Sequence, residues 1–309
     1  MNPPPAAQNP HKDNPLLGMG CAVAAFFFLA VMNVFAKKLA VNHSVIEIAF
    51  YRNIIAIWPF LFLIFVMGKK EIMTIKTSPR TIVVRSVLGT ISLALTFAAF
   101  AMMPMADATA FLFTSSLLIP AAGFFFLGEK VGAQRWGAVL VGFMGVLVML
   151  QPDGNVNLAG AGVALAAACM HATLQIILRK LGKTENPETV TFYFVFIGMF
   201  VSLIPMPLVY VQPRWEEAPL IIGLGITGVM GQFFISTAYK YAPAAIVTVF
   251  NYSGIIWATL FGWYFWDEFP THTILTGAAI VIASNIFIVW RENRLAKRNQ
   301  AVVQEADPL

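Results

Sequence analysis

The sequence predicts an all-α membrane protein with ten transmembrane helices, built as two inverted five-helix repeats. Three observations support this fold class: the apolar composition, an internal repeat, and the uneven distribution of lysine and arginine between loops. Of the 309 residues, 59% are hydrophobic and 11% are charged, whereas charged residues make up about a quarter of a soluble domain. The composition therefore indicates a chain that lies mostly in lipid.

Apolar runs long enough to cross a bilayer, roughly 20 residues each, fill almost the whole chain. They are continuous and do not alternate with period two, which argues against the strands of an outer-membrane barrel. The connecting segments are short, so we expect consecutive helices to be antiparallel neighbours. The expected spans lie at about residues 16–36, 45–68, 81–102, 105–127, 132–150, 158–178, 187–211, 217–239, 243–266 and 271–290.

An internal repeat relates the two halves of the chain, 16–151 and 152–290. A shift of 139 positions places Pro104 on Pro243, Thr109 on Thr248, Phe111 on Phe250 and Glu129 on Glu268. A shift of 142 positions places Gly18 on Gly160, Gly20 on Gly162, Ala30 on Ala172 and Lys38 on Lys180. The chain is therefore interpreted as one five-helix unit written twice.

The loop charges predict the orientation of the helices. With the N-terminus in the cytoplasm, the inner segments contain 15 lysines and arginines and the outer segments contain 3. Because such residues gather in cytoplasmic loops, both termini are expected inside the cell, at a bacterial inner membrane. Five helices per repeat is an odd number, so the second repeat enters the membrane from the opposite face. Inverted repeats of this kind are typical of secondary transporters.

The remaining composition predicts no cofactor and no metal site. Both cysteines, Cys21 and Cys169, lie within apolar spans, which favours two small buried side chains over a disulfide or a metal site. The net charge of +5 is attributed to cytoplasmic loops and not to nucleic-acid binding. Residues 1–15 lack an apolar signal-peptide core and are expected to form a disordered cytoplasmic tail, and residues 291–309 a second tail on the same side.

The junction of the fourth and fifth spans carries a motif. Pro120 is followed by a Gly/Ala-rich apolar run, by Gly128-Glu129, and then by Gln134, Trp136 and Gly137 at the start of the next span. On this motif the chain resembles an EamA-type member of the drug/metabolite transporter superfamily, over nearly the whole stretch 16–290. The segments FYRN (50–53) and VVRSVLGT (83–90) resemble a subgroup annotated for S-adenosylmethionine, riboflavin or other organic solutes. The resemblance implies a ten-helix transporter with a central cavity lined by both halves.

Two arginines lie within predicted spans, where a central charge costs roughly 2.5–3.5 kcal/mol on insertion scales. Arg52 is a candidate anchor for a substrate carboxylate or phosphate, because a guanidinium pairs bidentately with such groups. Its alternatives are an ion pair with Glu47 or Asp107, or an extension toward the outer interface. Arg85 is a second candidate, but it starts the third span from the cytoplasmic side, so extension toward water is the favoured interpretation.

Amides and one histidine are the next candidates. His171 and Gln175 are four residues apart on one face of the sixth span, and Asn33 is the repeat mate of Gln175. We expect the two amides to meet near the pseudo-axis, either lining a cavity or holding helices together. His171 is the one buried group that titrates near neutral pH, although a packed neutral histidine is favoured over a proton carrier.

The fourth and ninth spans supply hydroxyl, amide and aromatic side chains in Thr114, Ser115, Asn251 and Tyr252. Hydroxyls in membrane helices often bond their own backbone, whereas an amide beside a ring suits a planar or amphipathic solute. The other residues expected along the binding site are Phe111, Tyr193, Gln232 and Trp257.

No Asp or Glu lies at mid-membrane depth in the expected spans. Because proton-coupled carriers use such carboxylates as relays, the sequence predicts exchange or facilitated transport, with His171 or Glu47 as the routes left for proton coupling. Glu129 and Glu268 lie at helix ends, where a structural role at helix N-termini or nearby cations is expected.

Together these observations predict alternating-access transport of a small organic metabolite that is amino-acid-like, S-adenosylmethionine-like or otherwise amphipathic or anionic. The expected partners are that solute and the lipid bilayer, with a monomer or homodimer as the assembly. An intramembrane enzyme and a membrane assembly protein are the alternatives. The sequence offers no His-Glu-x-x-His and no phosphate-binding Gly-Lys-Ser/Thr loop for the first of these.

Overall fold

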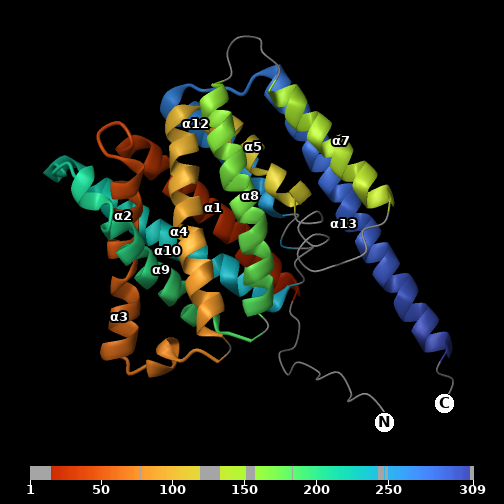
Figure 1. Cartoon of the computed structure of the whole chain (residues 1–309), viewed down its shortest axis with the longest axis horizontal. Helices are drawn as coiled ribbons and strands as arrows, with labels where there is room; N and C mark the ends of the chain where they lie inside the picture. Colours follow the sequence, from red (N-terminus) through yellow and green to blue (C-terminus); the bar gives the residue numbers. More distant parts are fainter. Residues whose placement is uncertain are drawn as a thin grey trace.

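The computed structural model describes residues 15–76, 78–118, 133–150, 157–182, 184–242, 247 and 250–306. Within these ranges the chain is helical and contains no strand, and each of the ten expected spans contains a helix (Figure 1). Five helical segments are long and apolar enough to cross a membrane: Leu16–Leu39, Val45–Phe65, Pro79–Met102, Leu158–Leu178 and Trp215–Tyr241. The predicted class, an all-α multi-pass membrane protein, is confirmed.

The helices of each half follow one another with short connections. The first half contains α1 (Pro15–Leu39), α2 (Val45–Ala56), α3 (Trp58–Phe65), η1 (Lys70–Met73), α4 (Pro79–Met102), α5 (Met105–Leu112) and α7 (Ala133–Met149). The second half contains α8 (Leu158–Leu181), α9 (Pro187–Leu203), η2 (Met206–Leu208), η3 (Trp215–Glu217), α10 (Ala218–Tyr241), α12 (Ser253–Trp266) and α13 (His272–Ala306). Pro120, Gly128 and Glu129 of the sequence motif lie outside the described residues.

The second expected span is divided at Ile57 into α2 and α3. Pro59 lies in the first turn of α3, where its missing N–H would have had no helical partner anyway. At the other end of α2, Ser44 forms a capping box with Glu47: the Ser44 N–H donates to the Glu47 carboxylate at 2.8 Å, and the Glu47 N–H donates to Ser44 Oγ at 3.3 Å. A proline and a capping box thus set the limits of α2.

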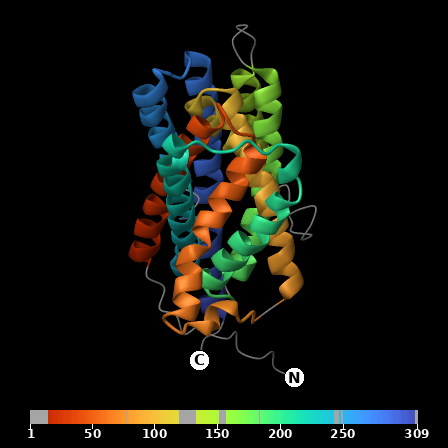
Figure 2. The ribbon, with the colours of Figure 1, turned by 90° about the vertical axis from the view of Figure 1, so that its left-hand side faces the viewer.

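Most of the extensive helix packing joins one half of the chain to the other. Helix α1 packs on α10, α4 on α8 and α9, α2 on α9 and α10, α5 on α12, and α7 on α13. The α7–α13 pair lies along one edge of the bundle in Figure 1, and Figure 2 shows the remaining helices packed as a bundle from the side. The two halves are therefore interleaved across one central interface.

Small residues permit the closest of these contacts. A Cβ placed on Gly145 of α7 would lie 2.8 Å from the carbonyl oxygen of Gly277 in α13, closer than such atoms approach. Next to this crossing, the Ser284 hydroxyl of α13 donates to the carbonyl oxygen of Ala138 in α7. Glycine thus lets two backbones meet, as small residues do in membrane helix pairs.

Candidate functional site

A cavity of 260 Å³ lies between the two halves, at the centre of the bundle. Its walls come from α1, α4, α5, α8, α9, α10 and α12, so both halves of the chain line it, as the family resemblance implied. Hydrophobic side chains such as Leu29, Leu93 and Phe100 form most of the surface. A mostly apolar pocket with a few convergent polar groups is the usual construction of a small-molecule site.

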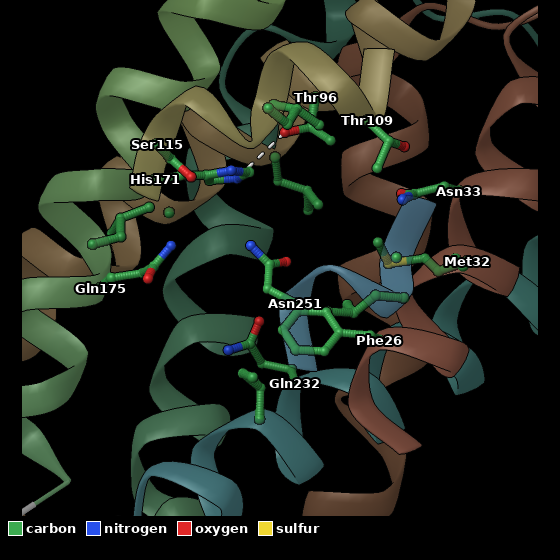
Figure 3. Close-up of a pocket in the computed structure, with 18 of the residues that line it drawn as sticks. Phe26, Met32, Asn33, Thr96, Thr109, Ser115, His171, Gln175, Gln232 and Asn251 are labelled. Carbon is green, nitrogen blue, oxygen red and sulfur yellow. Dashed lines mark hydrogen bonds between the residues drawn. The ribbon is translucent and has the colours of Figure 1, made fainter. Parts of the chain in front are cut away.

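Seven of the predicted site residues line this cavity: Asn33, Arg85, Ser115, His171, Gln175, Gln232 and Asn251. In Figure 3, Gln175 of α8 and Asn33 of α1 lie on opposite sides, with Asn251 between them. The expected direct meeting of Asn33 and Gln175 is therefore not seen. Instead, the amides present separate donors and acceptors to the same space.

The hydrogen bonds of this wall leave several polar atoms available to a solute. His171 Nε2 lies 3.4 Å from Thr96 Oγ1, whose hydroxyl donates to the Ser92 carbonyl oxygen at 2.8 Å. Since a threonine has one hydroxyl proton, His171 Nε2 donates in this pair and its Nδ1 is left as an acceptor. Asn33 Oδ1 is enclosed and has no protein partner in the part of the chain that the structure describes.

Six predicted residues do not line the cavity: Arg52, Phe111, Thr114, Tyr193, Tyr252 and Trp257. Phe111 is fully buried in the apolar core. The Tyr193 hydroxyl donates to the carbonyl oxygen of Met73 at 2.8 Å. The Tyr252 ring packs edge-on against Phe113 with centroids 5.3 Å apart, and Trp257 packs against Phe27 at 5.1 Å. These side chains stabilise the helix packing around the cavity.

The two arginines differ from the interpretations that the sequence favoured, although Arg85 was also a candidate for the site. Arg52 is 1% exposed and forms no ion pair with Glu47 or Asp107; its guanidinium donates to Asn53 Oδ1 at 2.8 Å and to the Gly228 carbonyl oxygen at 3.0 Å. Arg85 is 5% exposed and faces the cavity. The expected extension of Arg85 toward water is wrong, because the rotation of α4 turns this residue inward.

Ion pairs and hydrogen bonds join the two halves at one end of the bundle. Lys37, at the end of α1, lies 2.6 Å from the carboxylate of Glu268, which also accepts from the Met105 N–H at 3.2 Å. His43 Nε2 lies 3.0 Å from the Glu217 carboxylate. The structural role expected for Glu268, at a helix N-terminus and a cation, is confirmed.

Sequence reasoning missed Thr96, Phe194 and Gly89 as cavity residues. The signal was present in α4, where Arg85, Gly89 and Thr96 fall on one helical face at spacings of four and seven residues. Phe194 occupies the position that corresponds to Arg52 under the shift of 142 residues, and one apolar ring among many gives no signal of its own. No group of three or more His, Cys, Asp or Glu side chains in the described ranges could hold a metal ion.

Apolar helices around a cavity between two halves of one chain, with a few polar groups in its wall, are the construction of a membrane solute carrier. The chain belongs to the EamA-like transporter family, whose sequence profile matches residues 16–151 and again residues 158–290. The resemblance inferred from the sequence is confirmed.

Several curated proteins are similar over most of their length. The pseudopaline exporter CntI of Pseudomonas aeruginosa is 27% identical over 87% of this chain and 94% of its own. The S-adenosylmethionine uptake transporter of Rickettsia felis is 27% identical over 92% and 96%, and the riboflavin transporter of Vibrio cholerae is 29% identical over 64% and 67%. A solved crystal structure matches with a TM-score of 0.64 at 16% identity, covering 92% of this chain and 99% of its own, which shows the fold alone.

Proposed function

We propose that this protein carries a small, polar organic metabolite across a bacterial inner membrane by alternating access, with the central cavity as the substrate site. One observation carries the proposal: amide side chains from both halves, Asn33 on α1 and Gln175 on α8, face the same enclosed space. A solute that bonds both amides contacts both halves, so its binding is coupled to their relative movement.

The pattern of helix packing supports an inverted repeat. The sequence repeat pairs α1 with α8 and α4 with α10. Replacing each helix by its mate therefore turns the α1–α10 contact into the α8–α4 contact, and both are extensive in the structure. The pairs α2–α9, α5–α12 and α7–α13 map onto themselves. A pseudo-two-fold axis exchanges equivalent contacts in this way. Rocking of the two halves about that axis would open the cavity to either side of the membrane in turn.

The contacts at the Lys37–Glu268 end fit the same mechanism. With both termini in the cytoplasm, this end faces outward, and the ion pair keeps it closed while the inner end opens. Exchange or facilitation is favoured over proton coupling, because the described part of the cavity wall contains no Asp or Glu. The related proteins are named for export or uptake of pseudopaline, S-adenosylmethionine and riboflavin, which supports an organic metabolite as substrate.

A cavity-filling substitution tests the proposal. Gly254 of α12 lines the cavity, and a Cβ built there meets only Thr109 Cγ2, at 4.0 Å. Gly254→Leu is therefore expected to fill the site without a backbone clash. Gly162→Leu on α8 is the matched control, because Gly162 is exposed and has no atom within 4 Å of its added Cβ.

The measurement is a thermal-shift screen of the purified protein against amino acids, polyamines, nucleosides, S-adenosylmethionine, riboflavin and organic acids, followed by counterflow in proteoliposomes with any stabilising solute. We expect Gly254→Leu to lose stabilisation and counterflow, and Gly162→Leu to keep both. Unchanged counterflow in Gly254→Leu would place the substrate elsewhere and reject the proposal.

A further inference from the structure

Two buried guanidinium groups flank one aromatic ring beside the cavity. The Arg52 guanidinium carbon lies 4.8 Å from the centroid of the Phe194 ring, and that of Arg85 lies 4.1 Å from it. Arg85 and Phe194 both line the cavity, whereas Arg52 lies behind them. Two positive charges therefore lie on one side of the substrate space.

The donors of the two arginines are used differently. Arg52 donates to Asn53 Oδ1 and to the Gly228 carbonyl oxygen. Arg85 Nη1 is enclosed but has no hydrogen-bond partner among the described residues. Arg52 Nε also has no partner among the described residues, but of the two arginines it is Arg85 that lines the cavity.

Neither charge is neutralised by a carboxylate in the described part of the chain. Glu47, the acidic residue nearest to Arg52 in sequence, accepts instead from the Val211 N–H at 2.6 Å and from the Ser44 N–H at 2.8 Å. Both arginines are at least nine-tenths buried, and a buried charge without a counter-ion is strongly unfavourable. The cavity therefore has a preformed preference for a negative charge.

Gly89 shapes this site. It lies one turn from Arg85 on the face of α4 that lines the cavity. A Cβ at this position would come within 2.9 Å of Phe194 Cε2 and 3.5 Å of Arg85 Nη1. Glycine here leaves room for the ring and the guanidinium to stack, which holds the guanidinium toward the cavity.

We propose that Arg85 binds a carboxylate of the transported solute, with Arg52 supplying a second positive charge behind Phe194. The inference rests on the proposed function, because it requires the cavity to be the substrate site. A carboxylate is favoured over a phosphate dianion because Arg85 lines the cavity and Arg52 does not, and the extra charge of a dianion would stay poorly solvated in this apolar site. The rest of the solute then lies against the amides of Gln175, Gln232 and Asn251.

The experiment compares each carboxylate with its own carboxamide. Purified full-length protein is screened by thermal shift at neutral pH against amino acids, aromatic monocarboxylates and dicarboxylates, each beside its amide, and against phosphate monoesters, nucleosides and polyamines. Hits are titrated on the parent protein, on Arg85→Gln and on Arg85→Lys. Arg80→Gln is the control, because Arg80 is an exposed arginine on the same helix.

We expect the best ligand to be a carboxylate whose amide binds at least about tenfold more weakly, the loss typical of one charge-assisted hydrogen bond. Arg85→Gln is expected to reduce the affinity for this carboxylate by a similar factor. Arg85→Lys is expected to reduce it less, and Arg80→Gln to leave it unchanged. If Arg85→Gln fails to fold, the difference in affinity between acid and amide on the parent protein still tests the carboxylate site.

Other outcomes separate this inference from the proposed function. A ligand that binds equally as acid and amide, or a phosphate monoester that binds when no carboxylate does, overturns the carboxylate site. If that ligand is also lost in Gly254→Leu, the cavity remains the substrate site and only the carboxylate is rejected. If no compound stabilises the parent protein, both proposals fail.

Discussion

At the scale of single residues, burial and hydrogen bonding distinguish two arginines that look alike in sequence. Arg52 has two of its donors occupied by protein acceptors, whereas Arg85 leaves Nη1 unused at the edge of the cavity. The first arrangement stabilises the contact between α2 and α10, and the second places an unpaired guanidinium in the cavity wall. The depth of each arginine in the membrane does not reveal this difference, whereas the side chains and carbonyl groups around each guanidinium do.

The Arg52→Ala variant is expected to lose stability more than ligand selectivity. Removing the guanidinium breaks the bonds to Asn53 and to the Gly228 carbonyl, which costs about 1–3 kcal/mol of unfolding free energy. Thermal unfolding of the purified variant measures this loss, with Arg80→Ala as the exposed control. An Arg52→Ala protein of parental stability that has lost all carboxylate binding would instead make Arg52 the direct ligand.

At the scale of helices, glycine contacts and helix breaks decide how the elements pack. Helix α10 carries glycines that face α1 and α2: a Cβ on Gly231 would come within 2.8 Å of Leu29, and one on Gly228 within 2.8 Å of Arg52 Nε. Phe113 directly follows α5, and Tyr252 directly precedes α12. The shift of 139 positions relates these two residues, each of which interrupts a helical run, and their rings contact each other. Interruptions at matching positions of two repeats are a feature of transporter folds.

The Gly145→Ala variant is expected to weaken the α7–α13 pair. The added Cβ would meet the Gly277 carbonyl oxygen at 2.8 Å, and because that atom is backbone, the helices have to separate. Overpacking of this kind costs about 1–3 kcal/mol, which outweighs the gain of up to about 1 kcal/mol in helix propensity. Thermal unfolding in detergent measures the difference, and Gly162→Ala, which adds a Cβ in open space, is expected to be neutral or stabilising.

At the scale of the whole molecule, we propose that contacts between the halves control which side of the cavity is closed. The Lys37–Glu268 pair is 10% and 24% exposed and connects the end of α1 to the residues before α13. Glu268 also holds the first turn of α5 through the Met105 N–H. One carboxylate therefore joins three helix ends from both halves, and its loss favours states in which this end is open.

The Lys37→Met variant is expected to raise the accessibility of the cavity from this end. A partly buried pair worth about 1 kcal/mol corresponds to about a fivefold change in the population of the open state. A cysteine placed at Thr109, with Cys21 and Cys169 replaced by serine, reports this change through its labelling rate with an impermeant maleimide. The double variant Lys37→Glu with Glu268→Lys is expected to restore the parental rate. Labelling that is equally slow in all variants would contradict the proposal that the Lys37–Glu268 pair keeps this end closed.

The length of the apolar runs and the internal similarity were sufficient to predict the helices and their class. Each expected span contains a helix, and the amide pair Asn33 and Gln175, found through the repeat, lines the cavity. The rotation of each helix was harder to predict, because apolar residues surround most of these helices and leave no strong polar face. For this reason Arg85 was expected to extend toward water and Tyr193 to line the site, and the structure places both differently.

The sequence by itself determined that this chain is a duplicated helical membrane protein, because apolar length and internal repetition are properties of the chain alone. The resemblance to the EamA-type transporters came from the motif between the fourth and fifth spans. Only the tertiary structure decided which polar groups share a cavity, since residues from seven helices meet there at sequence separations that no local pattern records. It also decided that Arg52 donates through both terminal nitrogens to protein acceptors, while Arg85 lines the cavity with Nη1 unpaired among the described residues. The physical reason is that hydrogen-bond satisfaction depends on what neighbouring helices present, and therefore on how they pack.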